Sequence, residues 1–323
     1  MRAVRFEQTG GPEVLHVVDA PTPEPKPGQA RVRHEAIGIN FIDTYHRTGL
    51  YPVKLPCTPG GEAAGVVDAV GEGVTAVKVG DRVGYSGGLG AYAEYNVVAA
   101  DRLVKLPEDI SDEQAAAMML QGMTVDMLLN RVRTTRAGET ILVHAAAGGV
   151  GLILCQWASA LGATVIGTVS TEEKAELARA NGCDHPILYK SQDFVALVDE
   201  FTGGAKVPVV YDSVGKDTFL RSLDCLQKRG MLVSFGQSSG AVDPFPPGLL
   251  AQKGSLYLTR PTLFDYIAKR NELEQSAAAL FAMVRSGKVR IDIGQRFPLS
   301  QAAEAHRSLE ARKTTGSTVL TIG

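Results

Sequence analysis

The sequence has few cysteines and no long hydrophobic run. No stretch of about 18 apolar residues occurs, because the best candidate, 152–161, is interrupted by polar residues. The N-terminal residues contain no apolar segment or cleavage site of the kind that marks a secretory signal. The four cysteines form no CxxC pair, which argues against a disulfide framework or a zinc ribbon: Cys57, Cys155, Cys183 and Cys225. We therefore expect a reduced, cytoplasmic protein without a membrane span.

The chain also lacks an excess of charge of either sign. Its 33 Lys and Arg against 35 Asp and Glu give a net charge of −2, which makes a nucleic-acid partner unlikely on composition. A hydrophobic share of 45% with 21% charged residues is ordinary for a globular protein and excludes a disordered or fibrous one. With roughly 150 residues per domain, 323 residues predict about two domains.

The first part of the chain, to about residue 106, predicts an antiparallel, barrel-like β domain. Short β-prone segments alternate there with clusters of Gly, Pro and Asp, which are typical of turns. The expected strands are Ala3–Phe6, Leu15–Val18, Ala30–Ile39, Gly65–Val70, Arg82–Tyr85 and Ala93–Val98.

The pattern changes after Pro107. Ser111 and Gln114 form a capping-box signature that opens an apolar helix through Met119. Apolar strands then alternate with amphipathic helices, which predicts a doubly wound parallel sheet covered on both faces, and an amphipathic segment follows at 264–285. The expected strands are Thr140–His144, Thr164–Val169, Val207–Asp212, Met231–Phe235 and Ser255–Leu258, and the expected helices are Gly149–Leu161, Thr171–Ala180 and Asp217–Leu226.

A turn of small residues lies between the first of these strands and its helix. Its spacing is Ala146-x-Gly148-x-x-Gly151, a variant of the dinucleotide fingerprint. Small residues are needed because a pyrophosphate can reach the backbone N–H groups and the positive helix end only where no side chain intervenes. A tight strand-to-helix turn would look similar, but the strand before it and the further strand–helix units favour dinucleotide binding.

The end of the second strand indicates which dinucleotide is bound. NAD-binding proteins carry Asp or Glu at that strand tip, whereas Ser170 and Thr171 stand here. Lys174 follows within one helical turn and can reach a 2′-phosphate, although it could also be a solvated helix residue. The sequence therefore favours NADPH over NADH.

Several longer motifs resemble the NADPH-dependent quinone oxidoreductases, the zeta-crystallin-like branch of the medium-chain dehydrogenase/reductase superfamily. The resemblance spans nearly the whole chain. It rests on the segments GINFIDTYHRTGLY (38–51), PGGEAAGVVDAVGEGV (59–74), GDRVGY (80–85), HAAAGGVG (144–151), VVYDSVG (209–215) and SFGQSSG (234–240).

The resemblance implies an α/β fold in which a Rossmann domain is inserted into a β-rich, GroES-like catalytic domain. The dinucleotide-binding domain is expected at 124–263, and the catalytic domain at 1–123 together with 264–323, with the active site in the cleft between them. In the family an edge of the Rossmann sheet pairs with a second copy, so 255–259 is expected to form a homodimer contact, although a buried intrachain strand would show the same pattern.

The same resemblance predicts that no metal is bound. Zinc-dependent relatives carry zinc ligands at the positions of Asn40, Gly61 and near Leu120, and none of these residues supplies a thiolate, imidazole or carboxylate. Only Glu62, beside the missing histidine, remains.

The cofactor contacts implied by the resemblance fall into a nicotinamide side, a pyrophosphate turn and an adenosine side. Arg312 is included as a basic residue that reaches the cofactor, with a solvated surface arginine as the ordinary alternative. The expected cofactor-binding residues are Asn40, Phe41, Tyr45, Thr124, Gly148, Gly149, Val150, Ser170, Lys174, Tyr189, Ser213, Phe235, Gly236, Ser238 and Arg312.

Quinone reduction needs positioning more than it needs a nucleophile, since the cofactor supplies the hydride. Substrate is expected to be positioned by Asn40, Asp43, Tyr45 and Tyr51, with no residue assigned as general acid. Asp43 could instead be an N-terminal helix residue and Tyr51 a loop aromatic. Two other functions stay open: an enone, alkenal or enoyl-thioester reductase, and a nonenzymatic NADPH-binding protein with a structural or RNA-binding role.

Overall fold

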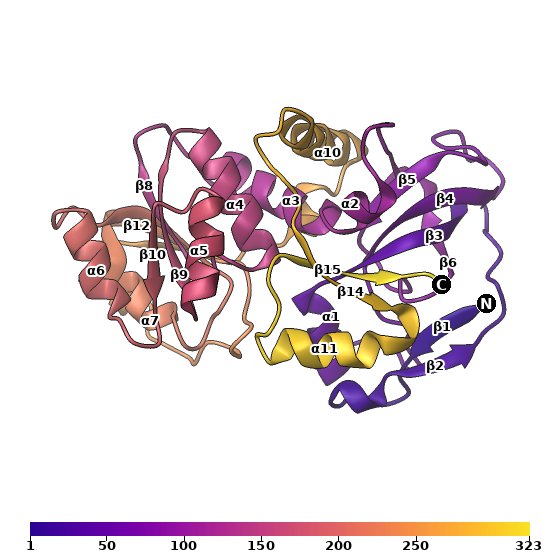
Figure 1. Ribbon diagram of the computed structural model, residues 1–323, viewed down its shortest axis with the longest axis horizontal. Coiled ribbons are helices and arrows are strands. Elements are labelled where there is room, and N and C mark those ends of the chain that lie inside the picture. The colour runs from indigo at the N-terminus through magenta and orange to yellow at the C-terminus, as the bar shows by residue number, and fades with distance from the viewer. The chain divides into compact units, whose positions relative to one another are not determined.

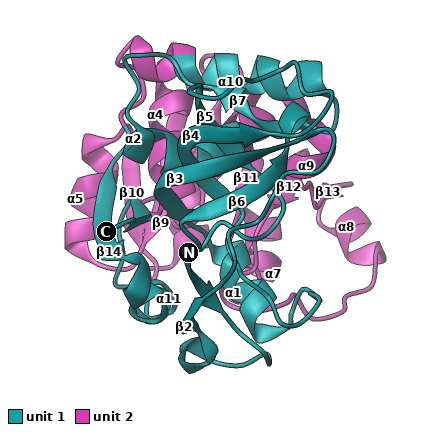
Figure 2. Cartoon of the chain, turned by 90° about the vertical axis from the view of Figure 1, so that its right-hand side faces the viewer, with its two compact units in different colours: residues 1–123, 267–281, 291–323 teal, residues 124–266, 282–290 magenta.

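The computed structural model describes all 323 residues, which form two compact units (Figures 1 and 2). Unit 1 comprises 1–123, 267–281 and 291–323, and unit 2 comprises 124–266 and 282–290. In the C-terminal part of the chain, 264–266 and 282–290 thus belong to unit 2.

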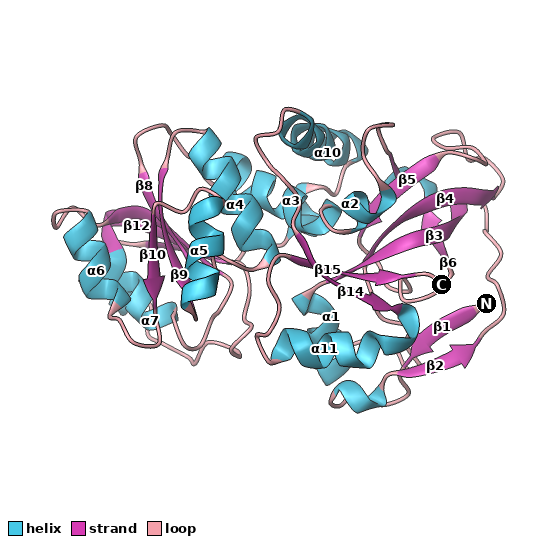
Figure 3. Cartoon of the chain, in the orientation of Figure 1, coloured by secondary structure: helices cyan, strands magenta, loops and turns pink.

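Unit 1 is built on a seven-stranded sheet with the order β14-β15-β3-β4-β5-β7, in which β6 also pairs with β3, and on a separate hairpin of β1 and β2 (Figure 3). Most pairs are antiparallel, as expected, but β14 and β15 from the C-terminal tail run parallel. The strands are β1 Arg2–Arg5, β2 His16–Asp19, β3 Gln29–Ile39, β4 Glu62–Val70, β5 Arg82–Ser86, β6 Tyr95–Ala99, β7 Val104–Lys105, β14 Ile293–Pro298 and β15 Ser317–Thr321.

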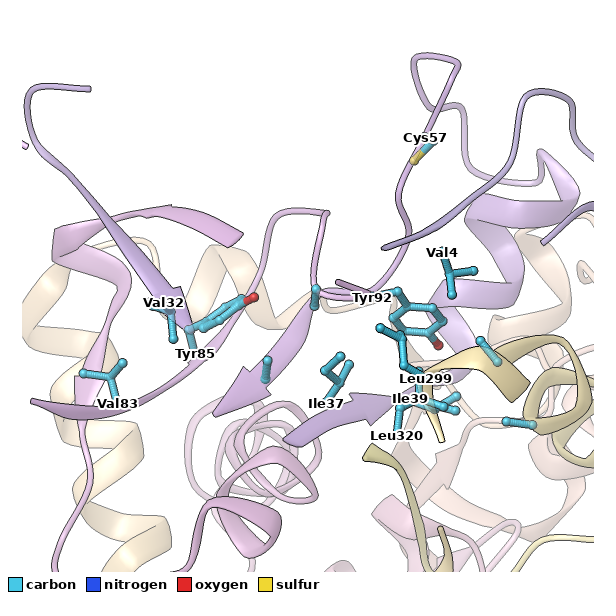
Figure 4. Close-up of a cluster of buried hydrophobic side chains, with 14 of the residues drawn as sticks. Val4, Val32, Ile37, Ile39, Cys57, Val83, Tyr85, Tyr92, Leu299 and Leu320 are labelled. Carbon is cyan, nitrogen blue, oxygen red and sulfur yellow. The ribbon is translucent and has the colours of Figure 1, made fainter. Parts of the chain in front are cut away.

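Alternating side chains of these strands fill the core of unit 1. Along β3, the residues at positions 30, 32, 34 and 36 are buried, while Arg31, Arg33 and Glu35 between them are more exposed, as the period of a strand requires. Two tyrosines, Tyr85 and Tyr92, lie in the same buried cluster (Figure 4).

The helices of unit 1 confirm the capping box and correct the helix that follows it. The Ser111 hydroxyl accepts a hydrogen bond from the Gln114 N–H at 3.2 Å. The helix does not run unbroken through Met119, because α2 ends at Ala116 and α3 begins at Met119. The helices are α1 Phe41–Thr48, α2 Asp112–Ala116, α3 Met119–Asp126, which continues into unit 2, α10 Arg270–Arg285, whose residues 282–285 belong to unit 2, and α11 Ala302–Glu310, with short 3-10 turns η1 Pro12–Val14, η2 Ala100–Arg102 and η5 Leu299–Gln301.

Unit 2 contains a six-stranded, fully parallel sheet with the order β10-β9-β8-β11-β12-β13, which confirms the doubly wound prediction (Figure 3). This is the strand order of dinucleotide-binding folds, in which the chain changes direction between the first and fourth strands. The strands are β8 Thr140–Val143, β9 Thr164–Val169, β10 His185–Leu188, β11 Val207–Asp212, β12 Leu226–Ser234 and β13 Tyr257–Thr259.

The edge strand β10 was not predicted. It is four residues long, contains Pro186 and is mostly half-buried, so neither its length nor its composition marks it as a strand. Proline is tolerated there because an edge strand has one side free of ladder hydrogen bonds.

One helical prediction in unit 2 needs correction. The helix expected at 217–226 is shorter, because Leu226 already pairs with Val207 in the sheet. The amphipathic segment predicted at 264–285 contains most of α9 Leu263–Tyr266 and all of α10. The helices of unit 2 are η3 Met127–Val132, which is π-helical, α4 Gly149–Ala160, α5 Glu172–Ala180, α6 Phe194–Phe201, α7 Phe219–Ser222, η4 Leu223–Cys225, α8 Gly248–Gln252 and α9 Leu263–Tyr266.

The longest helix, α10, has 16 residues. None of the helices combines the length and the apolar character that crossing a membrane requires.

Gly151 allows α4 to approach the turn after β8 closely. A Cβ atom at Gly151 would lie 2.2 Å from the Ala145 carbonyl oxygen, a distance that backbone atoms cannot relieve without moving. We expect Gly151→Ala to lower the free energy of unfolding by about 1–3 kcal/mol through overpacking. Urea unfolding checks this, with Gly248→Ala as the control because a Cβ there meets nothing within 4 Å. An unchanged midpoint for Gly151→Ala would contradict the close approach.

Candidate active site

The carboxyl edge of the unit 2 sheet collects most of the predicted cofactor residues. A predicted cofactor residue follows each of the strands β9 to β12 directly, and Gly148 follows β8 after the turn 144–147. The carboxyl ends of parallel strands lie at one edge of a sheet. The residues brought together in this way are Gly148, Gly149 and Val150 after β8, Ser170 and Lys174 after β9, Tyr189 after β10, Ser213 after β11, and Phe235, Gly236 and Ser238 after β12.

The turn before α4 presents backbone donors without a covering side chain. The first helical hydrogen bond runs from the Leu152 N–H to the Gly148 carbonyl at 2.9 Å, so the N–H groups of Gly149, Val150 and Gly151 have no acceptor within the helix. The cap residue, Gly148, supplies no side-chain acceptor, and the first turn carries no acidic residue. The Ala146 N–H bonds the Thr168 carbonyl at 3.0 Å and fixes the turn against β9. These residues therefore fit a pyrophosphate at the positive end of α4.

The ends of β9 and β10 place the predicted 2′-phosphate residues on neighbouring strands. Thr171 caps α5 by accepting a hydrogen bond from the Lys174 N–H at 3.4 Å, which puts Lys174 in the first helical turn. The Tyr189 N–H bonds the Val169 carbonyl at 3.2 Å, so Tyr189 lies beside the residue that precedes Ser170. A hydroxyl, an ammonium and a phenol thus lie on adjoining strand ends, a donor set suited to a phosphate.

Asp212, which the sequence analysis did not single out, shapes the loop after β11. Its fully buried carboxylate accepts hydrogen bonds from the Val214 N–H at 2.7 Å, the Gly215 N–H at 3.1 Å and the Thr218 hydroxyl at 2.9 Å. An aspartate at the end of a buried strand, followed by a turn, is the sequence signal that could have identified it.

The loops after β11 and β12 pack against each other. The Ser238 N–H bonds the Ser213 carbonyl at 3.1 Å. A Cβ atom at Gly236 would come within 2.6 Å of the same carbonyl oxygen, so this approach requires glycine. The loops that carry the residues predicted for the two ends of the cofactor are therefore in contact in unit 2.

Five predicted cofactor residues do not belong to these strand ends: Asn40, Phe41 and Tyr45 at α1 of unit 1, Thr124 and Arg312. Thr124 is buried on α3. Arg312 is exposed in the turn after α11 of unit 1, with a left-handed φ of 57°.

In unit 1, three predicted residues form an aromatic group on α1 and the loop after it. The ring centroids of Phe41 and Tyr45 are 6.3 Å apart, and those of Tyr45 and Tyr51 are 5.3 Å apart with an edge-on arrangement. The Tyr51 N–H bonds the Tyr45 carbonyl at 3.0 Å and fixes the loop to the helix. Phe41 and Tyr51 are half-buried, which leaves part of each ring accessible.

Asp43 points into the protein, which favours its role at the helix N-terminus over the predicted contact with substrate. It is 1% exposed, and one carboxylate oxygen, Oδ2, accepts both the Asn40 N–H at 2.9 Å and the Tyr92 hydroxyl at 3.0 Å. Burial raises the pKa of Asp43 to about 7, against the lowering effect of these hydrogen bonds.

A buried polar chain continues from Asp43 to the surface, and sequence spacing gave no indication of it. The Tyr92 hydroxyl lies 2.9 Å from Nε2 of His306, and Arg47 reaches Nδ1 of His306 at 3.1 Å. Arg47 also forms a salt bridge with Glu310 at 2.6 Å, which compensates its burial. Residues this far apart in the chain are joined only by the tertiary fold.

Asn40 is held by Glu62, the residue that stood beside the missing zinc ligand. Asn40 Nδ2 donates to Glu62 Oε2 at 2.6 Å, and the Leu120 N–H donates to Glu62 Oε1 at 2.6 Å. Glu62 is fully buried, and burial raises its pKa to about 8. No group of three or more His, Cys, Asp or Glu side chains is arranged to hold a metal ion.

We expect Asp43 to make stability pH-dependent. Because its pKa is raised on folding, the folded state keeps a proton that the unfolded chain loses above about pH 4. Its contribution to stability is therefore complete in acid and is lost as the pH rises through about 7. In Asp43→Asn, the amide oxygen can accept both hydrogen bonds without a charge, so urea unfolding from pH 5 to 8.5 should show a smaller decline than in the wild type. Equal declines in the two proteins would contradict the raised pKa.

Comparison with known proteins agrees with this geometry. Residues 26–108 match the family model of the alcohol dehydrogenase GroES-like domain, and 149–282 match that of the zinc-binding dehydrogenases. The chain is 55% identical over 321 residues to a quinone oxidoreductase of Pseudomonas aeruginosa, covering 99% of each chain. It is 46% identical to a 2-haloacrylate reductase of a Burkholderia species, covering 98% of each chain.

Solved structures show the same relationship. The crystal structure of Escherichia coli quinone oxidoreductase complexed with NADPH has a TM-score of 0.98 and 51% identity, covering 99% of this chain and 100% of that one. At this level of identity over nearly its whole length, the chain belongs to the quinone oxidoreductase family of the medium-chain dehydrogenases and reductases.

Proposed function

We propose that this protein is an NADPH-dependent quinone reductase that acts on a small quinone without a metal ion. The observation that carries the proposal is the uncovered first turn of α4, whose free N–H groups lie at the point where the strand order of the sheet reverses. The names of the relatives and the NADPH in the related E. coli structure support the choice of reaction and cofactor.

Unit 2 is proposed to hold the cofactor. Gly148, Gly149 and Val150 would line the pyrophosphate, with Gly149 and Val150 as its N–H donors because the Gly148 N–H bonds the Ala145 carbonyl, and Ser170, Lys174 and Tyr189 would bind the 2′-phosphate. Ser213 would line the adenosine side, with Phe235, Gly236 and Ser238 on the nicotinamide side. Thr124 and Arg312 remain predicted contacts, as do Asn40, Phe41 and Tyr45 of unit 1. When bound, NADPH supplies the hydride.

Unit 1 is proposed to position the quinone. The half-buried rings of Phe41 and Tyr51 can stack on a flat ring. Asn40 keeps one Nδ2 hydrogen that no group of the chain accepts, and this hydrogen can bond a carbonyl oxygen as negative charge develops on it. Asp43 would act on the substrate only through the Asn40 backbone that it holds.

Reduction of an activated carbon–carbon double bond is a second candidate activity. It is favoured by the 2-haloacrylate reductase among the relatives, because the chain covers 98% of that protein. An activated alkene accepts the same hydride at carbon, so the cofactor site does not distinguish the two reactions.

Parallel assays separate these candidates. NADPH absorbance is followed with 1,4-benzoquinone, 2-chloroacrylate and a simple aldehyde, and repeated with NADH and with a chelator. We expect the fastest turnover with benzoquinone and NADPH, unaffected by the chelator. Faster turnover of 2-chloroacrylate would favour the alkene reductase, and chelator-sensitive aldehyde turnover would contradict the metal-free proposal.

Lys174 should select the phosphorylated cofactor. Loss of a charge-assisted hydrogen bond in Lys174→Ala should weaken NADPH binding by ~1.5–3 kcal/mol and leave NADH binding nearly unchanged. Isothermal titration calorimetry measures both affinities, with Lys228→Ala, an exposed lysine on β12, as the control. Equal losses for the two cofactors would show that Lys174 does not bind the 2′-phosphate.

We also propose a homodimer formed through β13. This strand pairs only with β12, so its other edge has free N–H and C=O groups, and Tyr257 on it is 59% exposed. Joining two such edges would extend one sheet through both copies.

Substitution at this edge tests the dimer. Tyr257→Arg should shift sedimentation at micromolar concentration from dimer toward monomer, because like charges would face each other across the twofold axis. Leu220→Arg, at an exposed residue on α7, should leave the dimer intact. A wild-type protein that sediments as a monomer would contradict the proposal.

A cytoplasmic location is proposed on the state of the cysteines. All four are free and buried, as expected for a protein of a reducing compartment.

A further inference from the structure

A chain of buried side chains links Glu62 to the C-terminal strand of unit 1 through two amides and a hydroxyl. Asn40 Nδ2 donates to Glu62 Oε2 at 2.6 Å, and Gln121 Nε2 donates to Asn40 Oδ1 at 3.2 Å. The Ser317 hydroxyl lies 2.8 Å from Gln121 Oε1. All four residues are less than 9% exposed, and Ser317 is on β15. No sequence motif marks Gln121 or Ser317 as functional.

The end of this chain offers the hydroxyl proton two acceptors. Ser317 Oγ is 2.8 Å from Gln121 Oε1 and 2.9 Å from the Ala117 carbonyl oxygen, yet a serine hydroxyl donates only one hydrogen. Either bond satisfies the serine. The choice determines whether Gln121 accepts from Ser317 or donates to it.

Two complete bonding patterns therefore exist. With Glu62 ionised, Asn40 donates to Glu62, Gln121 donates to Asn40, and Ser317 donates to Gln121. With Glu62 protonated, Glu62 donates to Asn40, Asn40 donates to Gln121, Gln121 donates to Ser317, and Ser317 donates to Ala117. Each amide turns by half a rotation between the patterns, and Leu120 donates to Glu62 Oε1 in both.

We propose that Glu62 is a positioning residue whose protonation reverses this chain and so decides whether Asn40 presents an N–H donor or a carbonyl acceptor. The inference rests on the proposed function only in assigning the presented atom to a quinone carbonyl. In the ionised pattern the second Nδ2 hydrogen of Asn40 is available to that oxygen. In the protonated pattern an acceptor replaces it and repels the carbonyl.

The surroundings of Glu62 favour a single carboxylate that sets the direction of the hydrogen-bond chain. A Cβ atom at Gly38 would lie 2.4 Å from Glu62 Oε2, so the carboxylate packs directly against the backbone of β3. Burial raises the pKa of Glu62 to about 8, within the range in which an enzyme works. The titratable groups that face it are Asp43 on α1, whose charge raises the pKa of Glu62, and Tyr92, which is bonded to Asp43. No titratable group comes from the other neighbouring residues, which are Gly38 of β3, Ala116 of α2 and Ser317 of β15.

Nuclear magnetic resonance of the cofactor-free, full-length protein directly tests whether the hydrogen-bond chain from Glu62 to Ser317 reverses. The Leu120 backbone N–H reports the charge of Glu62, and the side-chain N–H₂ signals of Asn40 and Gln121 report the direction. We expect all three to titrate together in the wild type, and to lose that step in Glu62→Gln, whose amide must donate to Asn40. A step of the same midpoint in Glu62→Gln would overturn the proposal.

A substitution at the far end gives a second test that does not alter Glu62. Ser317→Ala removes two hydrogen bonds from the protonated pattern and one from the ionised pattern, so the Leu120 midpoint should fall by about 0.5–1 pH unit. Thr318→Val, at the neighbouring residue that bonds Gln295 instead, should leave the midpoint unchanged. An unshifted midpoint in Ser317→Ala would show that the chain does not reverse as a unit.

Kinetics tests the consequence for catalysis. Wild-type kcat/KM for benzoquinone should rise through the same midpoint, Ser317→Ala should shift that rise to lower pH, and Glu62→Gln should lose about tenfold at high pH with NADPH affinity unchanged. If the side-chain amide signals titrate but benzoquinone is not turned over, the proposed function is rejected and the reversible hydrogen-bond chain stands. If benzoquinone is turned over but the amide signals do not titrate, only the reversal of the hydrogen-bond chain is rejected.

Discussion

The N–H groups of Gly149, Val150 and Gly151 at the start of α4 have no acceptor within the helix. The proposed function depends on a cofactor phosphate accepting their hydrogen bonds. The close approach at Gly151 and the bond from Ala146 to β9 hold these donors at the carboxyl edge of the sheet. No side chain caps this helix and its first turn holds no acidic residue, so an anion is the natural partner of these donors. The strand order then places the remaining cofactor residues around the same edge.

Unit 1 depends on a different constraint, the burial of charge. Asp43, Glu62 and Arg47 are almost inaccessible, and each is stabilised by several hydrogen bonds or by an ion pair. Because burial raises the pKa of both carboxyl groups, their protonation can change near neutral pH. The N-terminus of α1, where Asn40 and the aromatic side chains lie, is thus held by groups that respond to pH.

The helices and strands could largely be predicted from the sequence because their sequence signals are local. β9 and β11 have the predicted bounds, the capping box at Ser111 is confirmed, and the family resemblance is confirmed by relatives at high identity. The misses are where tertiary contacts outweigh local pattern. β10 is a strand because it pairs with β9, and β12 begins at Leu226 because that residue pairs with Val207. The polar chains from Asp43 to Glu310 and from Glu62 to Ser317 join distant segments, and no spacing reveals them.

The most direct test of the central claim is a titration of the isotopically labelled protein with NADPH, followed through its backbone amide resonances. The account predicts downfield shifts of the Gly149, Val150 and Gly151 N–H signals as they bond the pyrophosphate, with saturation at one cofactor per chain. If these three signals stay in place while NADPH binds elsewhere, or if NADPH does not bind, the account is wrong.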